Sequence, residues 1–283
     1  MTATLDTRTT GARPASPPGS VGSWWRQVAA LTRRNLWHVR REPAQLSDAT
    51  VQPVLFTVLF VYIFGAAMVI PGGTYKQFAI AGLVVFNITT STMGTAVGVS
   101  ADLKSGVIDR FRTLPMARSA ILAGRTFSDL LASILCATIV LVTGFVIGWR
   151  PGNGLPGVVA GLAVAVLFAY AMSWLMACVG LSVGDPESAQ GIGLLVLFPI
   201  AFVSSAMVPI QGMPGWMQPI AEWNPVSAVA GSLRELFGNP NPAALRDNFP
   251  SQNPVLMAIV WSLAIMAVCI PIARARLRAR TVD

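Results

Sequence analysis

The sequence predicts an all-α membrane protein that crosses the bilayer six times. Hydrophobic residues make up 54% of the 283 residues, charged residues only 11%, and the mean hydropathy is +0.62. A water-soluble domain carries about 25% charged residues, so this chain could not cover a water-facing surface. A membrane-spanning helix needs roughly 17–25 predominantly apolar residues, and six such runs are present. The predicted spans cover about residues 47–70, 77–100, 126–148, 155–183, 191–207 and 254–273.

The net charge of +8 does not indicate a nucleic-acid-binding protein. The basic residues flank apolar runs and form no soluble basic face, so a nucleic acid is not an expected partner. Cys136, Cys178 and Cys269 all lie inside apolar runs without a CxxC spacing. We interpret them as small buried side chains and expect no metal site.

The N-terminal region is expected to lie in the cytosol. Residues 1–22 are rich in Thr, Pro, Gly and Ser and lack the apolar core of a secretory signal, so they predict a disordered tail. Residues 23–44 predict an amphipathic helix in the headgroup layer, with rings toward the acyl chains and guanidiniums toward anionic lipid. A nucleic-acid-binding arm is the alternative. The residues that define this interfacial helix are Trp24, Trp25, Arg33 and Arg34.

Two aromatic stripes lie within predicted spans. Phe56, Phe60 and Phe64 repeat every fourth residue in the first span, and Phe198 and Phe202 do so in the fifth. Such stripes suit a path for planar apolar substrates. They equally suit contacts with lipid or with neighbouring helices.

The second span has a polar face. Asn87, Ser91 and Thr95 follow at i, i+4 and i+8, which favours hydrogen bonds between helices and leaves a substrate path as the alternative. Gly94 and Gly98 form a small-xxx-small pair that predicts the close approach of another helix.

An acidic residue lies one turn inside the third span. Asp129 follows Arg125 by four residues, and we predict a local ion pair between them at the membrane edge. A functional role is the alternative, because an acidic residue in a span is a functional candidate.

A charged segment, residues 101–125, separates the second and third spans where a minimal polar turn would suffice. Its apolar residues, Phe111 and Leu114 among them, recur at helical spacing. Pro115 ends this short helix, since proline cannot continue the hydrogen-bond ladder. We interpret the segment as a helix held against the membrane face and exposed to a partner.

Residues 208–238 are too rich in proline to span the bilayer and too apolar for a free loop. Two short helices at the outer leaflet fit better. An asparagine caps the second helix, proline takes its first position, and Gly238 ends it. The residues that define this outer hairpin are Pro214, Trp216, Trp223, Asn224 and Pro225.

The distribution of charge predicts the topology. Sixteen of the twenty lysine and arginine residues fall on one side if the N-terminus is cytosolic. Only Lys76, Arg150, Arg234 and Arg246 fall outside. The positive-inside rule therefore places both termini and the 101–125 segment in the cytosol. The transmembrane domain then covers 45–276, followed by a cytosolic tail at 277–283.

Two stretches resemble a known family. GVIDRFRTLPMARSAILAGR, residues 106–125, looks like the cytosolic coupling segment of ABC-2-type transporter permeases. VLFPIAFVSSAMVPIQGMPGWMQPIAEWNPVSAVAGSLRELFG, residues 196–238, is similar to that family's fifth span, outer hairpin and Asn-Pro signature. The likeness is greatest to the daunorubicin-resistance permeases of bacteria, and it covers nearly the whole chain.

The resemblance implies a permease subunit of an ATP-driven exporter in the bacterial cytoplasmic membrane, with a hydrophobic or amphipathic drug, antibiotic or lipid as substrate. A separate ATPase, in two copies that bind Mg-ATP, would dock on the interfacial helix and the coupling segment, and a second, identical permease chain is expected. No cofactor is expected in this chain, which lacks GxxxxGK[ST] and would not be an enzyme alone. The expected coupling residues are Asp109, Arg110, Phe111, Arg112, Leu114 and Pro115.

Two other classes fit less well. An ion-coupled secondary transporter needs ionisable groups near the midplane, whereas Asp129, the acidic residue inside the third span, lies near an edge. A membrane-embedded enzyme would need a cluster of His, Asp and Glu, and the chain has one histidine, His38.

Overall fold

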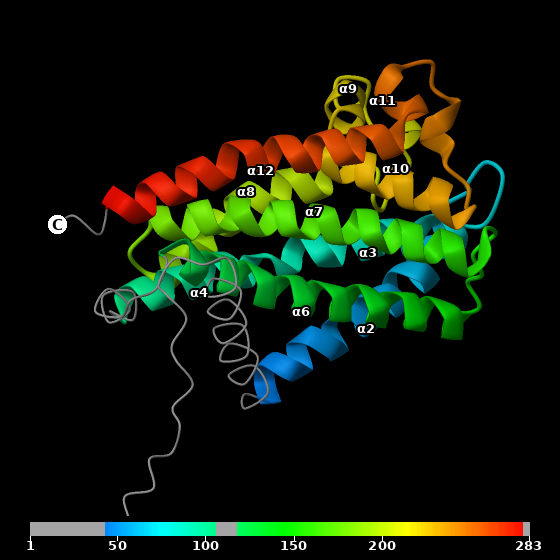
Figure 1. Ribbon diagram of the computed structural model, residues 1–283. Coiled ribbons are helices and arrows are strands. Elements are labelled where there is room, and N and C mark those ends of the chain that lie inside the picture. Colours follow the sequence, from blue (N-terminus) through cyan, green and yellow to red (C-terminus); the bar gives the residue numbers. More distant parts are fainter. Residues whose placement is uncertain (1–42, 106–117, 280–283) are drawn as a thin grey trace, which may run out of the picture.

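A computed structural model describes residues 43–105 and 118–279, and over these ranges the protein is a bundle of helices without a named strand (Figure 1). The longer helices are α2 (Pro43–Ala67), α3 (Tyr75–Ser91), α4 (Met93–Lys104), α6 (Arg118–Ile147), α7 (Gly154–Ser182), α8 (Pro186–Phe202), α10 (Pro225–Phe237) and α12 (Pro254–Ala279). The short ones are η1 (Ile210–Gly212), α9 (Gln218–Glu222), η2 (Pro242–Leu245) and α11 (Phe249–Gln252).

Five helical stretches in the described part of the chain are long and apolar enough to cross a membrane. The protein is therefore a multi-pass membrane protein. Helix α8 is apolar but has only 17 residues. The five stretches are Thr50–Ala67, Tyr75–Lys104, Gly124–Ile147, Gly154–Ser182 and Pro254–Leu277.

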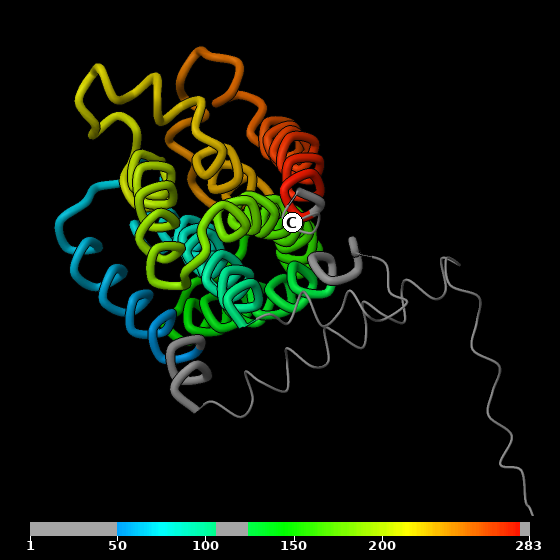
Figure 2. The backbone as a smooth tube through the Cα atoms, turned by 90° about the vertical axis from the view of Figure 1, so that its left-hand side faces the viewer, coloured from blue at the N-terminus to red at the C-terminus, as the bar shows by residue number. Residues whose placement is uncertain are grey.

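Helix α7 lies at the centre of the bundle, where it packs against α4, α6, α10 and α12. Helices α2 and α12 lie on opposite sides (Figures 1 and 2). The bundle has two ends: at the Lys104 end α4 stops, α8 starts and α12 ends, and at the Gly238 end α10 stops and α7 starts. The short helices α9 and α11 gather near the Gly238 end (Figure 1).

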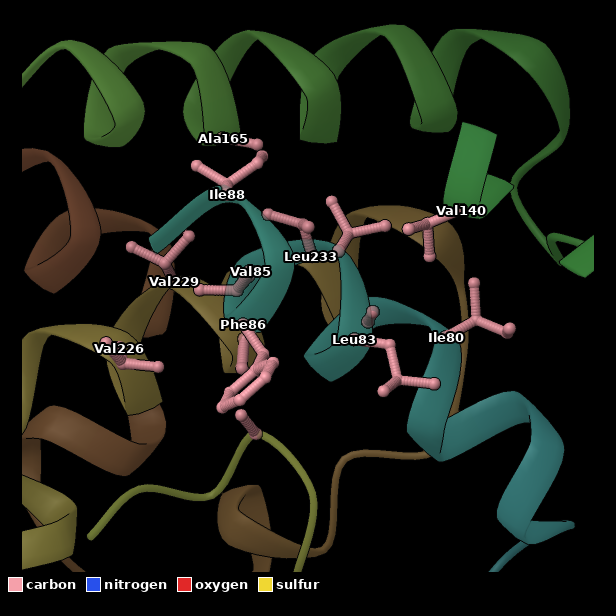
Figure 3. Packing of buried hydrophobic residues seen from close by; sticks show 14 of the residues in the cluster. Ile80, Leu83, Val85, Phe86, Ile88, Val140, Ala165, Val226, Val229 and Leu233 are labelled. Atoms are coloured by element: carbon pink, nitrogen blue, oxygen red, sulfur yellow. The ribbon is translucent and has the colours of Figure 1, made fainter. Parts of the chain in front are cut away.

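Helix α3 forms the core because other helices surround it. It packs against α2, α6, α7, α8 and α10, and its residues are buried without interruption from Phe78 to Thr89. A helix that is apolar all round is expected to be buried in this way. In Figure 3, Leu83 and Ile88 of α3 lie among side chains of the neighbouring helices, such as Val229 of α10.

Two predicted spans differ from the helices observed. The second, predicted to be continuous over 77–100, is interrupted at Thr92, whose hydroxyl donates to the carbonyl of Thr89 (2.6 Å). The fifth, predicted over 191–207, is helical only to Phe202. Residues 203–209, which come next, are described and continuous but non-helical. We call this interruption of the helix the chain break.

The Gly238 end is held by aromatic packing. The Phe237 ring is fully buried, 5.4 Å edge-on from the Trp149 ring. Asn153, before α7, donates its side-chain amide to the carbonyls of Glu235 (3.2 Å) and Leu236 (3.0 Å) at the end of α10. The start of α7 and the end of α10 are therefore joined.

We expect Phe237→Ala to lower the free energy of unfolding by about 3–5 kcal/mol, because it removes a buried ring from a packed site. Thermal unfolding of the protein in detergent measures this. Phe249→Ala is the control, since the Phe249 side chain is 57% exposed. Equal effects of the two changes would contradict the packing described for Phe237.

Candidate functional site

Two groups of predicted site residues lie outside the described residues. They are the coupling residues Asp109, Arg110, Phe111, Arg112, Leu114 and Pro115 and the interfacial residues Trp24, Trp25, Arg33 and Arg34. The structure does describe the helices on both sides of residues 106–117, α4 and α6.

Arg125 joins α4 to α6 across these flanks. Its guanidinium lies 3.6 Å from the carboxylate of Asp129 and 3.9 Å from that of Asp102, and it donates to the carbonyl of Gly94 (3.1 Å). The Thr95 hydroxyl donates to the same Asp129 carboxylate (2.7 Å). The predicted Arg125–Asp129 pair is confirmed, and it belongs to a larger cluster that includes residues of α4.

The prediction that another helix approaches Gly94 and Gly98 closely was wrong, because the Arg125 side chain fills the space beside Gly98. A Cβ on Gly98 would overlap the Arg125 guanidinium, whereas a Cβ on Gly94 would meet nothing within 4 Å. The bare backbone of α4 therefore provides the space in which Arg125 reaches its partners.

A second polar contact joins α4 to α8 at the Lys104 end. The Lys104 ammonium contacts the Asp185 carboxylate at 2.6 Å. Asp185 is also the N-cap of α8 and accepts from the backbone N–H of Glu187 (3.1 Å) and Ser188 (3.3 Å). The pKa of the Asp185 carboxyl is held below its usual range, mainly by the hydrogen bond from Lys104 and to a smaller extent by that from the Ser188 backbone. The ends of α4 and α8 are thus joined.

The two predicted aromatic stripes meet in one row. The rings of Phe56, Phe60 and Phe64 stack at 4.8 and 4.9 Å along α2, and Phe56 stacks on Phe86 of α3 at 5.6 Å. Phe86 meets Phe202 of α8 edge-on at 5.5 Å.

Phe202 in turn stacks on Phe198 at 5.0 Å, and both side chains are 51% exposed. The aromatic row therefore runs across α2, α3 and α8 and reaches the surface on α8. Phe86, which links its two halves, was not among the predicted site residues, because no other ring lies three or four residues from it in the sequence.

The polar face of the second span is engaged in hydrogen bonds. The hydroxyls of Ser91 and Ser133 lie 3.3 Å apart between α3 and α6, and Thr95 contacts Asp129. Asn87 donates to the carbonyl of Leu83 in its own helix (2.8 Å). The predicted hydrogen bonds between helices are therefore confirmed for Ser91 and Thr95, whereas Asn87 bonds within its own helix.

The outer hairpin contains helix α10 with the predicted cap. The Asn224 side chain accepts from the backbone N–H of Val226 (2.7 Å), Pro225 is the first helical residue, and Gly238 ends the helix with φ +67°. These three predictions are confirmed. The first short helix, α9, spans only Gln218–Glu222, so Trp216 precedes it and Trp223 follows it.

The two tryptophans of the hairpin face outward. The side chains of Trp216 and Trp223 are 72% and 56% exposed. Pro214 begins a turn, since its carbonyl accepts from the backbone N–H of Met217 (2.9 Å).

Arg234 does not lie where the distribution of charge places it. The positive-inside rule places it outside the membrane, but its side chain is fully buried among α3, α10 and the chain break. Its local sequence gives no signal of burial, because Arg234 lies in the last turn of α10 and is followed by a second charged residue, Glu235.

We expect Gly98→Ala to destabilise the protein by about 1–3 kcal/mol, because the added methyl group must displace the Arg125 guanidinium from its partners. Gly94→Ala, one turn away, is the matched control and should have little effect. Thermal unfolding in detergent compares the two. The cluster as described would be wrong if both variants melted like the wild type.

Comparison with known proteins shows the family of the chain. The model of the ABC-2 type transporter family matches residues 26–237. The daunorubicin resistance ABC transporter permease protein DrrB1 of Streptomyces coeruleorubidus is 34% identical over 214 residues, which cover 74% of this chain and 76% of that protein.

A second relative matches nearly end to end. The "Probable doxorubicin resistance ABC transporter permease protein DrrC" of Mycobacterium tuberculosis is 26% identical over 274 residues, 95% of each chain. The match covers the aromatic row, the cluster around Arg125 and the outer hairpin alike. On this evidence the chain belongs to the ABC-2 type transporter family and is a membrane permease.

Proposed function

We propose that this protein is the permease subunit of an ATP-driven exporter that moves hydrophobic or amphipathic compounds out of the cell. Anthracycline-like drugs, antibiotics and lipids are the cargo class. The observation that carries the proposal is the aromatic row, because stacked rings that reach the surface on α8 offer flat faces to planar apolar molecules. The names of the two relatives support the same cargo class.

The proposed topology has six crossings in the bacterial cytoplasmic membrane, with the Lys104 end and both termini in the cytosol. The five long stretches and α8 are the crossings. A 17-residue helix is about 26 Å long, short of the roughly 30 Å hydrocarbon core, so the chain break completes the crossing of α8. Residues 45–276 form the transmembrane domain, between cytosolic segments 1–22, 23–44 and 277–283.

The proposed partner is a separate ABC ATPase in two copies, which binds Mg-ATP and drives two identical permease chains. Phe111 and Leu114 would fill a groove on the ATPase, and Arg110 and Arg112 would meet acidic residues at its rim. Asp109 and Pro115 would bound this coupling helix. The interfacial helix would lie beside it in the headgroup layer through Trp24, Trp25, Arg33 and Arg34.

Force on the coupling helix would pass into the bundle through the polar contacts of α4. The cluster around Arg125 holds α4 to α6, so both flanks of the helix would move together. The contact between Lys104 and Asp185 would pass the same movement to α8. Because α8 carries part of the aromatic row, movement at the cytosolic end would reach the cargo.

Cargo would enter from the inner leaflet, move along the aromatic row and leave past the outer hairpin. The proposed path is lined by Phe56, Phe60, Phe64, Asn87, Ser91, Phe198 and Phe202. The proposed outer gate consists of Pro214, Trp216, Trp223, Asn224 and Pro225. The exposed rings of Trp216 and Trp223 would lie at the outer membrane interface, where amphipathic rings are favoured.

An ATP-driven mechanism is favoured over ion coupling by the contacts of Asp129. Its carboxylate lies 3.6 Å from the Arg125 guanidinium and accepts a hydrogen bond from Thr95, so contacts between α4 and α6 account for an acidic residue in a span. Efflux that stopped on ATP depletion but survived an uncoupler would support the ATP-driven mechanism. The reverse result would favour a secondary transporter.

We expect Phe111→Asp to leave the protein inserted in the membrane but to abolish association with the ATPase and cargo efflux, because a charge replaces the apolar anchor of the interface. Co-purification and efflux assays measure the two losses. Phe111→Leu is the control and should retain both. Normal efflux by Phe111→Asp would remove the coupling role from this segment.

We expect Phe202→Ala to raise the KM for a planar cargo several-fold while basal ATP hydrolysis by the complex stays unchanged, because the row loses a ring near the surface of α8. Phe249→Ala changes a similarly exposed ring outside the row and serves as the control. Transport into inverted vesicles gives the KM. Equal KM values for the two variants would contradict the path.

A further inference from the structure

Arg234 is a buried cation held by uncharged groups. It lies in α10 and is fully buried, and in the described part of the chain no carboxylate lies within ion-pair distance of it. Its guanidinium donates to the carbonyls of Phe78 (3.1 Å), Ser205 (2.7 Å) and Ala206 (2.9 Å) and stacks on the Phe78 ring at 3.7 Å. These contacts come from α3 and from the chain break.

The chain break needs such partners. Outside a helix its carbonyls have no intrahelical donors, and an apolar bundle offers no water to replace them. A planar guanidinium has five donors in a fixed fork, so it can satisfy several carbonyls at once, which a lysine ammonium cannot do in the same geometry.

Side chains of α3, of α10 and of its N-cap bind further backbone groups of this stretch. Tyr75 donates to the carbonyl of Met207 (3.2 Å), and the hydroxyl of Ser227 accepts from the backbone N–H of Ser205 (2.8 Å). Asn224 donates to the carbonyls of Ile200 (2.8 Å) and Val203 (2.6 Å). The break is thus bound on two sides, by α3 and by α10.

A glycine lets the break approach α3 closely. A Cβ on Gly82 would overlap the carbonyl of Ala206, one of the two break carbonyls that accept from Arg234. Gly82 therefore provides the space for the break, and Arg234 holds the break in it.

We propose that Arg234 is a positioning residue that joins α3, the chain break and α10 into one unit, so that a movement of α8 reaches the outer hairpin and is not lost as bending at the break. The inference rests on the proposed function, because it assigns α8 the task of carrying movement from the ATPase. It predicts that a variant with fewer hydrogen bonds from residue 234 hydrolyses more ATP for each molecule that it exports.

The first test is local and requires no cargo. Amide hydrogen exchange is measured on the purified full-length protein in lipid nanodiscs, for the wild type, Arg234→Lys and Arg150→Met. The control Arg150 also donates to carbonyls, of Phe145 and Trp149 (both 2.8 Å), but its residue is exposed. In Arg234→Lys we expect exchange to rise at least tenfold in residues 203–209 and in α10 together, with α6 and α7 unchanged.

The second test is the number of ATP molecules hydrolysed per molecule exported, measured on the complete complex in vesicles with a fluorescent anthracycline as probe. Arg234→Lys should raise this ratio at least fivefold while association with the ATPase stays normal. A loss of stability alone would lower hydrolysis and export in parallel. If Arg234→Lys does not fold, Tyr75→Phe replaces it, because it removes one hydroxyl that holds the break and keeps the ring.

The outcomes separate the two proposals. Unchanged exchange at the break, or raised exchange with an unchanged ratio, would overturn the role of Arg234. Failure of the wild-type complex to export any probe with ATP would overturn the proposed function. The exchange measurement would then still decide whether Arg234 joins the three elements.

Discussion

The structure depends on satisfying a piece of backbone that leaves its helix inside an apolar bundle. Helix α8 ends at Phe202, and several carbonyls and one N–H group of the chain break find their partners in side chains. This requirement accounts for two polar residues of α10, Ser227 and Arg234, whose side chains bind the chain break. It also accounts for a glycine in the most buried helix, where a larger residue would keep the break away.

Helix α8 is held by polar contacts at both ends and by rings between them. Asp185 secures its start to α4, and Asn224 and Arg234 secure the chain break after its end. Between these points it contributes Phe198 and Phe202 to the aromatic row. An exposed ion pair contributes little to the free energy of unfolding. The contact with Lys104 therefore serves mainly to fix the position of the start of α8 relative to α4.

Much of this could be predicted from local sequence. Apolar runs located the long helices, the Asn-Pro pair located the start of α10, and four-residue spacing paired Arg125 with Asp129. The coupling helix stays a prediction. The end of α8 could not be predicted from hydropathy. Residues 203–207 are apolar enough on average for a membrane span, and hydropathy does not show where the backbone hydrogen bonds of a helix stop. The burial of Arg234 escaped prediction for a related reason: its acceptors lie 28 to 156 residues away in sequence, beyond any local pattern.

The sequence positions of those acceptors have a consequence for synthesis in the cell. Phe78, Ser205 and Ala206 all precede Arg234, so the ribosome has made the entire carbonyl cradle before the arginine emerges. Chains fold from the N-terminal side while they are being translated. The guanidinium can therefore pass from the translocon directly to waiting acceptors, and this charge need never be exposed to lipid on its own.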